Sequence, residues 1–149
     1  MRLAYITLTS LTALLTVSCS PSSISPQSDT TAVTSKPRAT KTYQPGVFQT
    51  AEHTTRGNVK VITENGKKFI EFDKNFKTDS GPDLLVILHK DKTLPNSGIK
   101  ERDYISVAPL TETSGTQRYT IPEKVDLQKF QSVAILCRQF NATFGYAPL

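Results

Sequence analysis

Much of the chain shows apolar side chains alternating with polar ones, the pattern of a half-buried β-strand. In NVKVITENGKKFIEFD (58–73), Val59 and Val61 alternate with polar neighbours, and a second apolar run follows a few residues later. Between the two runs stand Asn65 and Gly66, a pair that strongly favours a two-residue hairpin turn. This segment therefore predicts a β-hairpin.

The segment DLLVILHK (83–90) is different, because it is apolar without interruption from Leu84 to Leu88. Such a run is typical of a strand that is covered on both faces. No stretch shows a convincing helical period. Further strands are expected in YISVAPL (104–110), QRYTIP (117–122), SVAILCRQF (132–140) and NATFGYA (141–147). Short strands at close spacing predict an all-β fold, either an antiparallel β-sandwich or a barrel-like single domain, over residues 42–149.

The longest polar connection within this domain is HKDKTLPNSGIKERD (89–103). One interpretation is a solvated turn between two strands, which is the common fate of polar connections. The other is a binding surface for a protein or a glycan. The residues alone favour the solvated turn and leave the second interpretation open.

The chain begins MRLAYITLTSLTALLTVSCS, in which Arg2 precedes an uncharged, mostly apolar stretch too short to span a membrane. Residues 1–18 are therefore expected to be an export signal. Small and apolar residues lead directly into Cys19, as in the signal peptides of bacterial lipoproteins, so Cys19 is the expected site of lipid attachment. The alternative is an ordinary secretory signal followed by an unmodified cysteine. The lipoprotein interpretation predicts a domain in the bacterial cell envelope, anchored to a membrane and facing outside the cytoplasm.

Residues 19–41 are rich in Ser, Thr and Pro, a composition that predicts a disordered linker between the anchor and the domain. The chain has a formal net charge of +5, and loss of Arg2 with the leader lowers this by one. The lysines are spread among acidic residues and are not interleaved with aromatic platforms. Nucleic acid is therefore not an expected partner.

Cys137, in SVAILCRQF, is the only cysteine besides Cys19. Strand alternation places its side chain on the same face as Val133 and Ile135, with Ala134, Leu136 and Arg138 on the opposite face. A free cysteine on an apolar face most often behaves as a small hydrophobic core residue. A reactive thiol would need access and a group that stabilises the thiolate, and Arg138 is directed elsewhere in a regular strand. Both roles remain open from the residues.

Other chemistry lacks the residues it requires. A nucleophilic cysteine needs an imidazole base, and the chain offers only His53 and His89, neither with a partner that the sequence identifies. Two histidines and one thiol at scattered positions do not predict a zinc or copper site. No phosphate-binding glycine loop or serine elbow is present. No metal and no cofactor is therefore predicted within this chain, and turnover of a small-molecule substrate is not expected.

Taken together, several fragments resemble the DM-thirteen domain family, also called electron-transfer DM-thirteen. The most specific are GPDLLVIL (81–88) and SVAILCRQFNATFGYAPL (132–149). Less specific matches lie in GVFQTAEHTTRGNVKV (46–61) and in YISVAPL followed by GTQRYTIP (104–122). The resemblance implies a mainly β domain of an extracellular or exported protein.

The resemblance also nominates particular residues. It implies that Cys137 is the redox candidate, that Gly81, Pro82 and Asp83 form the turn into the apolar strand, and that His53 is a motif position of unknown role. The function it implies is accessory electron transfer through Cys137, with a redox or surface protein partner supplying any redox cofactor. The alternative is a protein- or glycan-binding adhesion module in which Cys137 is only a core residue.

Overall fold

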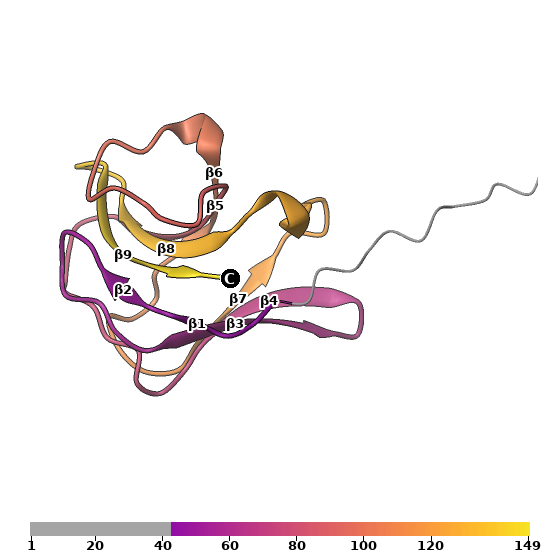
Figure 1. Ribbon diagram of the computed structural model, residues 1–149. Coiled ribbons are helices and arrows are strands. Elements are labelled where there is room, and N and C mark those ends of the chain that lie inside the picture. The colour runs from indigo at the N-terminus through magenta and orange to yellow at the C-terminus, as the bar shows by residue number, and fades with distance from the viewer. Residues whose placement is uncertain (1–42) are drawn as a thin grey trace, which may run out of the picture. The chain divides into compact units, whose positions relative to one another are not determined.

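The computed structural model describes residues 43–149 (Figure 1). The predicted signal peptide (1–18), the predicted lipid-attachment site Cys19 and the predicted linker (19–41) lie outside the described residues. No helix within the described part is long and apolar enough to cross a membrane.

Residues 43–149 form two antiparallel sheets that face one another (Figure 1). One sheet has the order β1-β3-β4-β7 and the other β2-β9-β8-β5-β6. The predicted all-β fold is confirmed as a β-sandwich, because neither sheet closes into a barrel. The strands are β1 (Gly46–Val47), β2 (Gln49–Thr50), β3 (Asn58–Glu64), β4 (Lys67–Phe72), β5 (Leu84–His89), β6 (Tyr104–Pro109), β7 (Gln117–Ile121), β8 (Ser132–Cys137) and β9 (Ala142–Pro148), with short 3-10 helices η1 (Glu101–Asp103) and η2 (Leu127–Lys129).

The core between the sheets is built by the alternation that the sequence shows. In β8, Val133, Ile135 and Cys137 point inward and pack with Phe72 and Ile70 of the facing sheet's β4. Burying such apolar surface contributes about 25 cal/mol for each Å² removed from water. Ala134 and Leu136 point to the other side of the sheet, as alternation requires.

That second side of the sheet is also covered, which explains why every residue of β5 is buried. The cover is the connection 90–103, whose Leu94 and Ile99 are buried against β5 and β8. The connection is fixed to the start of β9, because the Thr143 amide donates to the Asn96 carbonyl at 2.7 Å. The connection is therefore more than a solvated turn: most of its residues are exposed, but Leu94 and Ile99 belong to a second, smaller core.

Two short strands, β1 and β2, were not predicted. They follow one another along the chain but belong to different sheets, since Gly46 pairs with Val59 of β3 whereas Gln49 pairs with Tyr146 of β9. At two residues each, they are too short for an alternating pattern to be recognised.

The sandwich has two ends with different connections. The hairpin end carries the Asn65-Gly66 turn between β3 and β4 and the connection 122–131. The Cys137 end carries the connections 51–57, 73–83, 110–116 and 138–141. In Figure 1 the β3–β4 turn lies at the right and the β8–β9 turn at the upper left.

Candidate functional site

Cys137 is the last residue of β8, has no exposed surface and makes no disulfide. The face predicted for its side chain is confirmed. Its Sγ lies 2.9 Å from the carbonyl oxygen of Pro82, so the thiol donates a hydrogen bond to that oxygen.

The turn that accepts this bond is exposed. Pro82 and Asp83 both lie at the surface, although the thiol beneath them does not. Asp83 has a φ of 54°, in the left-handed region that few residues other than glycine, Asn and Asp occupy. A backbone conformation of this kind costs about 1–3 kcal/mol and persists only where surrounding contacts impose it.

Arg138 supplies those contacts. Its Nε and Nη2 lie 2.7 Å and 3.2 Å from the two carboxylate oxygens of Asp83, a bidentate pairing, and its amide donates to the Asp83 carbonyl at 3.1 Å. The hydrogen bonds to Asp83 raise the pKa of the Arg138 guanidinium above its ordinary value. Arg138 therefore fixes the turn and is not available as a charge partner for the sulfur of Cys137.

Phe144 of β9 supports the turn from inside. A Cβ on Gly81 would lie 2.6 Å from Cζ of Phe144, so only glycine fits at this position without movement. The His53 ring also packs against the Phe144 ring, with ring centroids 3.9 Å apart. His53 Nδ1 also lies 3.3 Å from a carboxylate oxygen of Asp79. His53 thus has an orienting partner that the sequence did not reveal.

The structure therefore brings the residues nominated by the resemblance to one end of the sandwich: His53, Gly81, Pro82, Asp83 and Cys137. Sequence reasoning missed the residues that connect them. Phe144 looked like an ordinary strand residue, and the pairing of Arg138 with Asp83 joins positions 55 apart in the sequence.

Proximity does not make this group a catalytic constellation. Within residues 43–149, no hydrogen bond joins His53 to Cys137, so the thiol has no base positioned to take its proton. The described part of the chain also contains no group of three or more His, Cys, Asp or Glu residues that could hold a metal ion. What the arrangement offers is a single thiol beneath a small, exposed turn.

A hollow of about 340 Å³ lies beside that turn. It is lined by Gly81, Asp83 and Leu84 on one side and by residues of the 109–113 segment on the other. Cys137 does not line it, although Cys137 pairs directly with Leu84 across the sheet. Contact between the sulfur and another molecule therefore requires the turn to move.

Comparison with known protein families gives a match to this domain. The model of the family described as electron transfer DM13 matches residues 47–149, which is nearly all of the described domain. The chain belongs to this family. Searches of the curated proteins and of the solved structures each found no match.

Proposed function

We propose that this protein is an accessory electron-transfer domain of the bacterial cell envelope, held to a membrane through lipid on Cys19 and facing outside the cytoplasm. Its redox group is the thiol of Cys137, and any redox cofactor belongs to a partner protein. Membership of the electron transfer DM13 family supports the class of activity.

One observation carries the assignment to Cys137. The sulfur is fully buried, yet the atom it contacts is the carbonyl oxygen of the exposed Pro82. The barrier between sulfur and solvent is thus one turn, held in a strained conformation by a surface ion pair. Surface ion pairs contribute little to stability, and the turn is held by a few local contacts outside the two sheets, so we expect its local opening to cost less than unfolding the sandwich.

The proposed chemistry is thiol–disulfide exchange. With the turn open, Cys137 loses its proton to water and the thiolate attacks one sulfur of a partner's disulfide. A sulfur–sulfur bond to Cys137 forms while the partner's own bond breaks, and the departing sulfur leaves as a thiolate that takes up a proton. One thiolate of a dithiol on a second partner then attacks the sulfur of Cys137 in the mixed disulfide, and the first partner leaves as a fully reduced dithiol. The other thiolate of the second partner attacks its neighbour's sulfur in the new mixed disulfide, which closes a disulfide within the second partner and releases Cys137 as a thiolate, so two electrons pass from the second partner to the first.

The test is the rate at which Cys137 reacts with an aromatic disulfide reagent in the native protein. In the full chain carrying Cys19→Ser, Cys137 is the only thiol. We expect it to react at neutral pH without denaturant, with a rate that depends weakly on urea because only the turn opens. Asp83→Asn removes the ion pair but keeps a residue that tolerates positive φ, and should raise the rate up to about fivefold.

The matched control is Lys60→Gln. It breaks another surface ion pair, Lys60 to Glu71 at 3.0 Å, that belongs to β3 and β4 and does not touch the turn. Its labelling rate should equal that of the parent. Reaction only at the rate of global unfolding, with the full urea dependence of unfolding, would exclude a redox role for Cys137.

A second function is favoured by a different observation, the absence of any exposed surface on Cys137 among the apolar residues of the core. In that case the cysteine is structural, and the domain is a binding or adhesion module that contacts a protein or a glycan through the exposed residues of connection 90–103. The labelling experiment separates the two, because a structural cysteine reacts only when the whole domain unfolds.

A further inference from the structure

We propose that the Cys137 end of the sandwich carries a binding site for a phosphate group, formed by Arg56, Lys74 and Lys77. These three cations line one hollow of about 320 Å³, together with Gly57 and Ser114. The proposal concerns a different surface from the turn over Cys137 and does not depend on the redox role of that residue.

The positions of Arg56 and Lys77 are fixed by the backbone. The Arg56 amide donates to the Lys77 carbonyl at 2.9 Å, and the Lys77 amide donates to the Arg56 carbonyl at 3.0 Å. This reciprocal pair forms an isolated antiparallel bridge, and Lys77 forms a second one with Ser114 on its other side. Directly opposed residues of such a pair project their side chains to the same face. The two cations are therefore held side by side, with the Ser114 hydroxyl next to them.

This arrangement is unfavourable unless something neutralises it, because like charges directly opposite each other destabilise a strand pair. No acidic residue lines the hollow. Neither Arg56 nor Lys77 forms an ion pair with any residue between 43 and 149. Lys74 lies at the border, where it also lines a second hollow that contains Asp73. The carboxylate of Asp73 is itself occupied by hydrogen bonds from Asn58 and Asn75.

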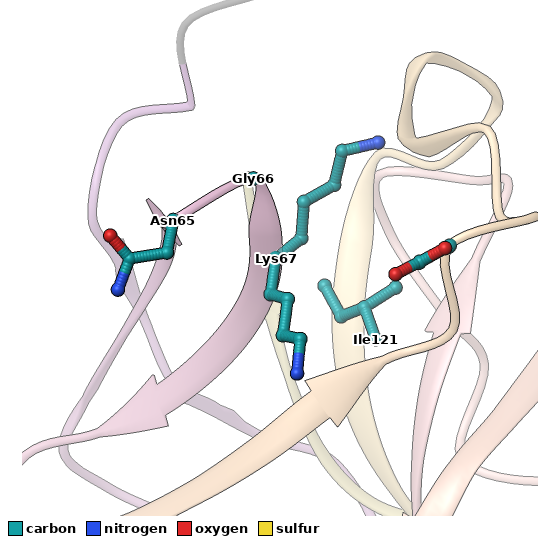
Figure 2. A pocket seen from close by; sticks show the side chains of 6 residues that line it. Asn65, Gly66, Lys67 and Ile121 are labelled. Atoms are coloured by element: carbon teal, nitrogen blue, oxygen red, sulfur yellow. The ribbon is translucent and has the colours of Figure 1, made fainter.

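A hollow at the other end of the molecule shows what an ordinary lysine-lined surface of this domain looks like. Figure 2 shows it beside the hairpin turn, where Lys67 lies near Ile121 and Asn65. Its volume is similar, about 340 Å³, but an acidic residue, Glu123, stands among its lining residues. The hollow of the proposed phosphate site differs, because all of its charged lining residues are cations.

The floor of the proposed site is close-packed backbone. Gly57 has a φ of 107°, and a Cβ there would lie 2.5 Å from Cα of Phe76. Phe76 is in turn buried in the main core, stacked on Phe72 with ring centroids 4.5 Å apart. The segments that carry the cations therefore rest on the core, so the backbone needs little ordering when an anion binds and the ordering cost is confined to the exposed side chains.

The charge and geometry select the class of ligand. Three cations match a doubly charged anion better than a single carboxylate. The guanidinium of an arginine presents a planar pair of donors that fits two oxygens of a phosphate, and lysine adds a point charge. The ligand class is thus a phosphate dianion, either free or as a monoester.

The test is a titration of the isotopically labelled full chain, carrying Cys19→Ser, with inorganic phosphate at constant ionic strength, followed by amide NMR shifts. We expect saturable shifts confined to the amides of Arg56, Gly57, Lys77 and Ser114. Because a hydrogen bond to a charged group contributes about 1.5–3 kcal/mol, Arg56→Gln should weaken binding by about tenfold or more. Lys77→Gln should weaken it as well, and a double variant should abolish it.

Lys67→Gln is the matched control, since it removes one exposed lysine from the hollow in Figure 2. It should bind phosphate as the parent does. A parallel titration with glycerol phosphate distinguishes the sources of the group: tighter binding of glycerol phosphate indicates a monoester, equal binding shows that the site accepts either source, and binding of inorganic phosphate alone indicates the free anion. Shifts that do not saturate, or that persist unchanged in the double variant, would overturn the proposal.

Discussion

The turns at the two ends of the sandwich both use left-handed backbone, but they are stabilised in different ways. At the hairpin end, Asn65 and Gly66 have φ values of 50° and 77°, and a Cβ on Gly66 would have no neighbour within 4 Å. At the Cys137 end, Gly81 is pressed against Phe144, and Asp83 is held at a φ of 54° by Arg138. The first turn is determined by its own residues, whereas the second is imposed by strands that are distant in the sequence.

The difference shows which of the two turns depends on the rest of the domain for its conformation. A locally determined turn can change with little effect on the core, because a side chain added at Gly66 would meet open space. A turn imposed by tertiary contacts connects the surface to the core, here through the bond from Cys137 to Pro82. Movement of the second turn therefore alters the environment of a buried side chain.

The largest expected effect comes from adding a methyl group to each turn. Gly81→Ala places a Cβ 2.6 Å from the Phe144 ring and 3.2 Å from a methyl carbon of Leu84. We expect it to lower the free energy of unfolding by about 1–3 kcal/mol, as overpacking does. Gly66→Ala meets no atom and only forces a non-glycine residue to positive φ, at about 1 kcal/mol. Urea unfolding of both variants measures the difference, and equal losses would contradict the contrast between the two turns.

A smaller effect is expected at the sulfur itself. Cys137→Ala removes the hydrogen bond to Pro82 and leaves a small void, so the free energy of unfolding should fall by about 1–2 kcal/mol. Cys137→Ser keeps a donor that can reach the same carbonyl and should be less destabilised. Thermal unfolding followed by circular dichroism compares the two. An alanine variant as stable as the parent would show that the thiol contributes nothing to holding the turn.

The smallest expected effect is a pH dependence that belongs to the hairpin end. Burial lowers the pKa of His89 below 6.5, despite opposing effects of Asp91 and Asp103, and its Nδ1 accepts a hydrogen bond from the Asp91 amide at 2.9 Å. The unfolded chain therefore takes up the proton at higher pH than the folded one. The contribution of His89 to stability is complete above 6.5 and is lost as the pH falls below it.

Urea unfolding at a series of pH values checks this effect. In the His89→Asn variant, which keeps an acceptor but does not titrate, the fall in unfolding free energy just below pH 6.5 should be reduced. An identical pH profile in the variant would show that His89 does not carry the dependence. A pH dependence of stability would then no longer distinguish the hairpin end from the Cys137 end.

The sequence predicts the features that depend on neighbouring residues and misses those that depend on tertiary contacts. The hairpin at Asn65 and Gly66, the doubly covered strand β5 and the inward face of Cys137 all follow from patterns within a few residues, and the structure confirms them. The cover over β5 did not follow, because Leu94 and Ile99 are isolated apolar residues in a polar segment and carry no period.

The candidate site shows more clearly what the sequence alone does not predict. Resemblance alone nominated His53, Gly81, Pro82, Asp83 and Cys137, and nothing in their spacing showed that they converge. Their connections run through residues that look unremarkable in the sequence and through pairings between strands β5, β8 and β9. Convergence of this kind depends on the complete sheet order, which no local pattern contains.

The side chain of Tyr43 fixes where the chain enters this domain, because its hydroxyl donates to the carbonyl of Leu127 in η2, at the hairpin end. From there, β8 runs the length of the sheet to Cys137, about 20 Å at the rise of a β-strand. The point where the chain enters and the buried sulfur therefore lie at opposite ends of the sandwich.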